Sequence, residues 1–102
     1  MNRVVNIAGY KFVELHGLDS LREKILSQCQ KNELKGSVLL SKNGINFFLA
    51  GSQESIDTFL ALLNEDPRLS EIPIKFSYTE YQPFRRMSVS YTHLRAHETS
   101  GY

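Results

Sequence analysis

Apolar and polar residues in the first third of the chain follow two different spacings. Residues 3–13 are rich in Val, Ile, Tyr and Phe on both sides of an extended chain, which predicts a central β-strand. In residues 19–31 the apolar residues recur every three or four positions with charged residues between them, which predicts an amphipathic helix. Asp19 or Ser20 is the expected N-cap of this helix.

A β-hairpin is predicted in the middle of the chain. Residues 35–41 and 45–50 are short apolar stretches that are typical of strands. The Asn43–Gly44 pair between them tolerates positive φ and is the strongest short-range signal for a tight turn. We therefore expect the two strands to pair antiparallel.

A second helix and a last strand follow the hairpin. Ser52 is a credible N-cap, and apolar residues after it follow the i, i+3, i+4, i+7 spacing of a helix face, at Ile56, Phe59, Leu60 and Leu63. Residues 74–81 alternate apolar and polar side chains, which predicts a strand with one face in water. The order β-α-β-β-α-β predicts an α+β, ferredoxin-like fold, in which two helices cover one face of a four-stranded antiparallel sheet.

Composition places limits on function. The chain has 102 residues, and 12 Lys and Arg against 11 Asp and Glu give a formal net charge of +1, so no strong overall field attracts nucleic acid or membrane. The single cysteine, Cys29, excludes an internal disulfide and a cysteine-based zinc cluster. No apolar run reaches the roughly 18 residues of a membrane span, and the N-terminus lacks the apolar core of a signal peptide, so we expect a cytoplasmic protein.

Four motifs carry a family resemblance over residues 3–87. They occur in the order NIAGYKFVEL, LKGSVLLSKNGINFFLAG, SQESIDTFL and QPFRRM, and the GIN, AG and PFRRM segments are the most specific. In this order they resemble the N-terminal domain of the bacterial tRNA uridine hydroxylases, a rhodanese-related family whose N-terminal domain is similar in fold to acylphosphatase. Phe47 and Phe48 depart from the small residues that are common after GIN in that family.

The resemblance implies a function for the full-length protein. Such a protein hydroxylates C5 of the wobble uridine, position 34, of certain tRNAs to 5-hydroxyuridine, with molecular oxygen as co-substrate. The reactive cysteine of the family lies in a rhodanese-like domain that follows PFRRM and is missing here. Cys29 does not match the active-site loop, so no catalytic residue is assigned. We expect this domain to hold no cofactor or metal, and to have tRNA and the missing domain, but no membrane, as partners.

The last residues carry a second resemblance. Residues 89–99, VSYTHLRAHET, resemble the translation of a transposase sequencing adapter read in frame. We therefore predict a ferredoxin-like domain in residues 1–87 and a non-native, poorly packed tail in residues 88–102. His93 and His97 are four residues apart in this tail but lack a third ligand, so no metal site is predicted.

Four residues are the candidates for nucleic-acid binding: Arg85, Arg86, Lys42 and Asn46. The two arginines follow the last predicted strand, where guanidinium groups could bind phosphate or dock on the missing domain. Lys42 could add to a positive surface or be an ordinary solvated charge. Asn46 is polar among apolar residues, so it should face the open side of the sheet or cap the turn. Tyr78 and Tyr81 could stack on bases or be half-buried sheet residues.

Three functions remain open at this point. The first is an accessory domain that helps bind or orient tRNA for a catalytic domain. The second is a structural or regulatory docking module without direct RNA contact. The third is a stand-alone acyl phosphate hydrolase, which needs an arginine in the loop after the first strand to hold the phosphate. That loop, residues 13–20, reads VELHGLDS and contains no Arg or Lys, which argues against hydrolysis.

Overall fold

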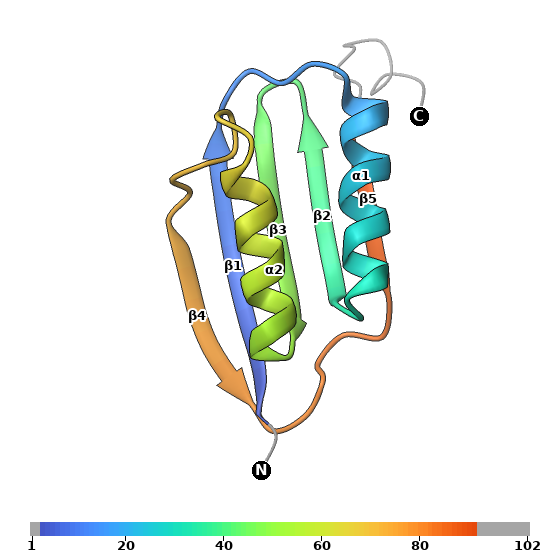
Figure 1. The fold of residues 1–102 in the computed structure, drawn as a ribbon, viewed down its shortest axis with the longest axis vertical. Helices are drawn as coiled ribbons and strands as arrows, with labels where there is room; N and C mark the ends of the chain where they lie inside the picture. Colours follow the sequence, from blue (N-terminus) through green and yellow to red (C-terminus); the bar gives the residue numbers. More distant parts are fainter. Residues whose placement is uncertain (1–2, 92–102) are drawn as a thin grey trace, which may run out of the picture.

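The computed structural model describes residues 3–91. The elements in chain order are β1 (Val4–Phe12), α1 (Leu18–Lys31), β2 (Lys35–Ser41), β3 (Gly44–Gly51), α2 (Gln53–Asn64), β4 (Ile74–Thr79) and β5 (Met87–Tyr91). Both helices lie on the same side of one sheet (Figure 1). The predicted order β-α-β-β-α-β is therefore confirmed by β1 to β4 and the two helices, and a further strand, β5, follows β4.

The sheet is larger than the sequence predicts. Within residues 3–91, its strand order is β4-β1-β3-β2-β5, which gives five strands where four are predicted. The three pairs among β1, β2, β3 and β4 are antiparallel, as expected, but β5 runs parallel to its neighbour β2. The sheet is thus mixed, and the prediction of a four-stranded antiparallel sheet is corrected by one strand at its edge.

Strand β5 is packed into the domain through Val89. This side chain is only 2% exposed and lies beside Val38 in the parallel register. The Arg22 side chain of α1 donates a hydrogen bond from Nε to the Val89 carbonyl at 2.6 Å. The prediction that residues 88–102 are poorly packed is therefore wrong for residues 88–91, while residues 92–102 lie outside the described part of the chain.

The predicted hairpin and the N-cap of the second helix are both found. Strands β2 and β3 pair antiparallel across the turn at Lys42 and Asn43. The Ser52 hydroxyl accepts a hydrogen bond from the Ser55 backbone N–H at 3.1 Å, which satisfies one of the free donors at the start of α2. The hairpin and α2 therefore begin and end close to where the sequence places them.

The first helix begins differently from the prediction. Its N-cap is Gly17, in a left-handed conformation with φ of 65°, and among residues 3–91 no side-chain hydrogen bond caps the start of the helix. Asp19 and Ser20 already lie inside the first turn, so the predicted capping by either residue is wrong. The chain needs a left-handed residue to enter α1 from the loop, and glycine adopts that conformation without steric cost.

The hydrophobic core lies between the sheet and the helices. Helix α2 packs over β1 and β3, and α1 packs over β2 and β5, as Figure 1 shows. Within the core, the rings of Phe47 and Phe59 meet edge to face, with their centroids 5.3 Å apart and their planes inclined by 76°. Strand β4 lies beyond the cover of α2, so Phe76 and Tyr78 face the helix side yet are 44% and 50% exposed. Their predicted apolar face is therefore only partly shielded from water.

Candidate nucleic-acid interface

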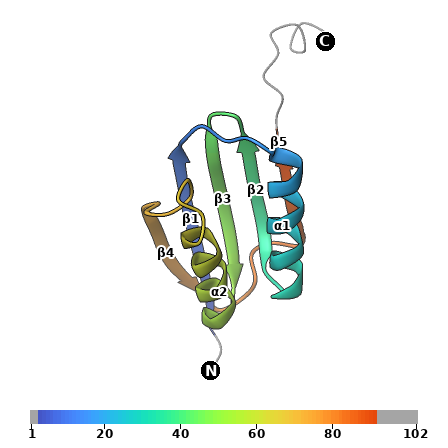
Figure 2. The ribbon, with the colours of Figure 1, turned by 45° about the horizontal axis from the view of Figure 1, so that its top comes forward.

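The face of the sheet opposite the helices is not covered by either helix (Figures 1 and 2). Side chains alternate between the two faces, so the buried residues Ile45, Phe47 and Leu49 of β3 point to the helices. The residues between them point the other way. Asn46 lies on this open face, exposed, in register between Tyr10 of β1 and Leu39 of β2. Of the two placements predicted for Asn46, the structure shows the open-face one.

Large apolar side chains gather around Asn46 on the open face. We call the following five residues the open-face patch: Tyr10, Phe12, Leu39, Asn46 and Phe48. Tyr10 is 64% exposed, Phe12 84% and Phe48 50%, and the Tyr10 and Phe12 rings meet edge to face at 5.8 Å. A shallow hollow of about 550 Å³ lies next to the patch, between Tyr10, Phe48 and Lys75 of β4. The patch therefore offers flat rings beside room for a planar ligand.

Sequence reasoning did not find the aromatic members of this patch. The departure of Phe47 and Phe48 from the small residues of the family does not distinguish the two, although strand alternation buries Phe47 completely and leaves Phe48 half exposed. Sequence reasoning also considered Tyr78 and Tyr81 as stacking residues. Tyr78 instead lies on the helix side of β4, with the Arg3 guanidinium 4.9 Å from its ring centroid. The signal that could have located the patch was the alternation of residues 45–50, read together with that of β1.

The charged residues of the strands are all basic within the described part of the chain. Within residues 3–91, no strand contains an Asp or Glu, and the acidic residues lie in helices and loops. Lys35 of β2 is in register with Ala50 of β3, and Lys75 of β4 is in register with Ala8 of β1. Strand alternation places both lysines on the open face. The open face is therefore weakly basic although the whole chain carries a formal charge of only +1.

The four predicted binding residues do not form one cluster. Arg85 and Arg86 are exposed in the connection between β4 and β5, and the Arg86 carbonyl accepts a hydrogen bond from Gly36 N–H at 2.8 Å. Lys42 is exposed in the turn at the opposite end of β2. At about 3.3 Å per residue, six residues of strand separate these ends by roughly 20 Å. Asn46 lies between them on the open face.

The connection that carries the two arginines is fastened to the sheet. Gln82 donates a hydrogen bond from its side-chain Nε2 to the Ala50 carbonyl of β3 at 3.1 Å. The Gln82 Oε1 atom in turn accepts from the Phe84 backbone N–H at 3.2 Å. Phe84 lines a hollow together with Asn6 and Phe48, beside the open face. The arginines are therefore held next to the end of the open face that Phe84 lines.

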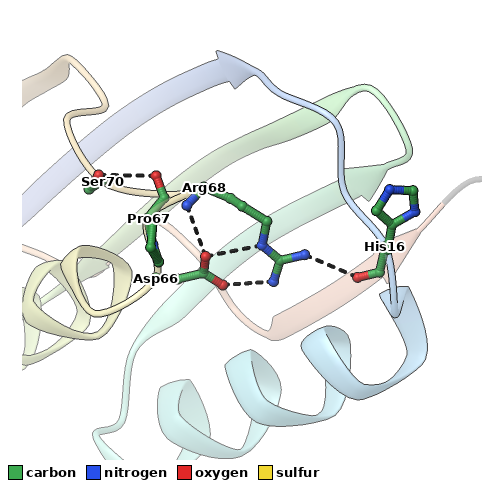
Figure 3. Close-up of polar contacts among 5 residues, drawn as sticks. All are labelled: His16, Asp66, Pro67, Arg68 and Ser70. Atoms are coloured by element: carbon green, nitrogen blue, oxygen red, sulfur yellow. Dashed lines mark hydrogen bonds and ion pairs between the residues drawn. The ribbon is translucent and has the colours of Figure 1, made fainter.

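A polar cluster joins the loop after α2 to the loop after β1 (Figure 3). Arg68 donates from Nε (3.0 Å) and Nη2 (2.7 Å) to the two carboxylate oxygens of Asp66, and from Nη1 to the His16 carbonyl (3.2 Å). The hydrogen bond from the Arg68 side chain lowers the pKa of the Asp66 carboxyl to about 2. The guanidinium that reaches the loop after β1 is thus neutralised by a carboxylate, so this loop does not provide the free cation that a phosphate cradle needs.

Cys29 lies on the buried face of α1 and is fully buried. Burial raises the pKa of its thiol to about 12, so a reactive thiolate is disfavoured. Within residues 3–91, no three His, Cys, Asp or Glu side chains come together in a way that could hold a metal ion. No helix in this part of the chain is long and apolar enough to cross a membrane.

Within residues 3–91, the element order and the two helices on one face of the sheet define a ferredoxin-like α+β domain. The model of the UPF0176 acylphosphatase like domain matches residues 4–93, and the chain belongs to this family. The resemblance of the chain to the N-terminal domain of a longer protein is thereby confirmed.

The similar curated proteins are much longer than this chain. A tRNA uridine(34) hydroxylase from Bordetella petrii is 54% identical over 89 residues, which cover 87% of this chain and 35% of that protein. A tRNA uridine(34) hydroxylase from Cupriavidus pinatubonensis is 49% identical over 87 residues, or 85% of this chain and 31% of that protein. The chain thus spans about a third of the length of the curated relatives it matches.

Solved structures support the fold. An acylphosphatase from Coxiella burnetii superposes with a TM-score of 0.61 at 16% identity, covering 86% of this chain and 93% of that chain. The structure titled "BlrP1 BLUF" superposes with a TM-score of 0.70 at 18% identity, covering 89% of this chain and 64% of that chain. At these identities the likeness concerns the fold alone.

Proposed function

We propose that this chain is the N-terminal accessory domain of an oxygen-dependent tRNA uridine(34) hydroxylase, and that it helps bind or orient tRNA. The hydroxylation to 5-hydroxyuridine takes place in a rhodanese-like domain of the full-length protein. The observation that carries the proposal is the open sheet face, which has lysines and exposed aromatic rings on strands that, within residues 3–91, contain no acidic residue. Support also comes from the relatives, which are named tRNA uridine(34) hydroxylases, since hydroxylation of a tRNA uridine requires contact with tRNA.

The electrostatics of the open face favour a polyanion. Lys35 and Lys75 lie on it, and the exposed Arg85 and Arg86 lie beside one end. Each phosphate that such a cation neutralises releases condensed counterions, which gives affinity that falls as salt rises. Because only a few cations are available, we expect weak binding by this domain alone, with a Kd on the order of 10 to 100 μM.

Docking of another protein surface is the second candidate. The observation that favours it is the exposure of Phe12 and Leu39, which are apolar and lie on the same open face. In that case the remainder of the full-length protein covers the face and Arg85 and Arg86 contact that remainder. A docking face of this kind predicts no RNA binding by the isolated chain. The acyl phosphate hydrolase gains no support, because Arg68 is occupied by Asp66.

A salt titration tests the proposal. Fluorescence anisotropy of labelled tRNA is measured with the 102-residue chain at several KCl concentrations. Lys75→Gln should weaken binding and reduce the slope of log K against log salt by about 0.7 to 0.9. Lys24→Gln, which removes the same charge from exposed α1, is the matched control and should leave the slope unchanged. Equal effects of the two variants, or no detectable binding of tRNA, would overturn the proposal.

A further inference from the structure

We infer that the open-face patch binds unpaired RNA bases by stacking, with Tyr10 and Phe48 as the principal platforms. This inference rests on the proposed tRNA-binding function and narrows it to a substrate class, the single-stranded segments of an RNA such as the loops of a tRNA. It shifts the centre of the interface from the four cationic and polar residues predicted from sequence to two aromatic side chains. Arg85, Arg86 and Lys42 then serve the phosphates around them.

The register of β1 and β3 places the two rings suitably. Tyr10 lies opposite Asn46, and Phe48 is two residues further along β3 on the same face. Such diagonal neighbours are about 7 to 8 Å apart at their Cα atoms. That separation lets each ring accept its own base on a flat surface that lies over two central strands. Base stacking on aromatic side chains tolerates any sequence, because every base has a π-face.

Asn46 lies beside both platforms and has a side chain suited to the edge of a base. Its amide presents two N–H donors and one carbonyl acceptor. Within residues 3–91, the side chain has no hydrogen-bond partner, so these groups are available to a ligand. A base that stacks on Tyr10 or Phe48 can therefore also form a polar contact with Asn46, as unpaired bases do when proteins read their Watson–Crick edges.

The positive charge of the open face favours RNA over an apolar protein partner. A contiguous exposed apolar patch can mark an interaction surface, but it does not identify the partner. Here Lys75 borders the hollow next to Tyr10 and Phe48, and no acidic side chain occurs on any strand within residues 3–91. A double helix cannot use the rings, because its bases are stacked inside. A single strand presents both phosphates for the lysines and bases for the rings.

A tryptophan at position 48 gives a direct readout of stacking. The chain contains no tryptophan, so the fluorescence of Phe48→Trp reports this site alone. The variant is titrated with oligouridine and with a blunt RNA duplex that has the same number of phosphates. Oligouridine should quench the fluorescence and the duplex should leave it nearly unchanged. Phe76→Trp is the matched control, since Phe76 is similarly exposed but lies on the helix side of the sheet.

Affinity measurements with Leu variants complete the test. Tyr10→Leu and Phe48→Leu should each weaken tRNA binding at least about fivefold, while Phe48→Tyr and the control Phe76→Leu should bind as the wild type does. Thermal unfolding of each variant verifies that the domain is folded. If Lys75→Gln weakens binding and the two Leu variants do not, tRNA binding stands and stacking is overturned. If neither the wild-type chain nor any of the variants binds tRNA, the proposed function itself fails.

Discussion

Phe48 and Phe76 are exposed to similar extents, 50% and 44%, yet their side chains lie on opposite faces of the same sheet. Phe48 of β3 is in register with Ala8 of β1, and Phe76 of β4 is in register with Ile7, the residue that precedes Ala8 in β1. Phe76 is exposed because α2 does not extend over the edge strand, whereas Phe48 is exposed because neither helix covers its face. A comparison of Phe48 with Phe76 therefore distinguishes exposure at the edge of the sheet from exposure on the candidate interface.

Strand β5 should contribute measurably to stability. A chain that ends at Met87 loses Val89, which is buried beside Val38, and we expect it to be less stable by at least about 1.5 to 3 kcal/mol. The measurement is urea denaturation. A chain that ends at Tyr91 keeps β5 and is the control. Equal stability of the two shortened chains would show that β5 does not belong to the folded domain.

The Asp66–Arg68 ion pair should make stability depend on pH in the acid range. The pKa of Asp66 is lowered from 3.8 to about 2 in the folded protein, so the pair stabilises fully above about pH 4 and loses this contribution as pH falls towards 2. Because the Arg68 side chain is 37% exposed, the effect should not exceed about 1 kcal/mol.

The variant Asp66→Asn tests this pH dependence. Its deficit in the free energy of unfolding relative to the wild type should be fully present at pH 6 and shrink as pH falls towards 2, since about half of the folded wild-type carboxyls are protonated at their pKa of about 2. Asp57→Asn on exposed α2 makes the same change in charge, and its side-chain oxygen can still accept the hydrogen bond from Gln53. A deficit for Asp66→Asn that stays constant over this range would contradict the ion-pair explanation.

The Cys29 thiol should be protected in the folded protein. It is fully buried, and burial raises its pKa to about 12, so both access and thiolate formation are disfavoured. At pH 8 we expect a disulfide reagent to modify it at least about 100 times more slowly than in the urea-unfolded chain. A rate in the folded protein equal to the unfolded rate would place the thiol at the surface.

Arg85 and Arg86 should act on RNA binding through charge. Replacing both by Ala is expected to reduce the salt slope of tRNA binding by about 0.7 to 0.9 for each phosphate contact that is lost. The matched control replaces Lys24 and Lys31 of α1 by Ala, which removes the same charge from the helix side. If the arginine variant behaves like this control, the two arginines do not contact RNA.

Local sequence signals were sufficient for several elements. Ser52 has a strong capping preference, and the Asn43–Gly44 pair indicates a nearby tight turn, so α2 and the β2–β3 hairpin followed from neighbours in sequence. The turn itself is formed by Lys42 and Asn43, and Gly44, which has a positive φ, begins β3. The start of α1 did not follow, because Asp19 and Ser20 were equally good caps on local grounds. The left-handed conformation at Gly17 comes from the path of the preceding loop instead.

Features that depend on distant contacts were missed. In β5 only Val89 is fully buried between two serines, and its neighbour Val38 is far away in the sequence. The open-face patch likewise arises where Tyr10 of β1 comes next to Asn46 of β3. Sequence alternation indicates which residues of one strand share a face, but the neighbouring strand and the cover over each face are set by the tertiary fold.

Amide chemical-shift mapping tests the central claim most directly. The isotope-labelled chain is titrated with tRNA at low salt, and the perturbed residues are placed on the structure. The account predicts that perturbations concentrate on the open face, at Tyr10, Asn46 and Phe48, and extend to Arg85 and Arg86. Perturbations confined to α1 and α2, or no perturbation at all, would contradict the account.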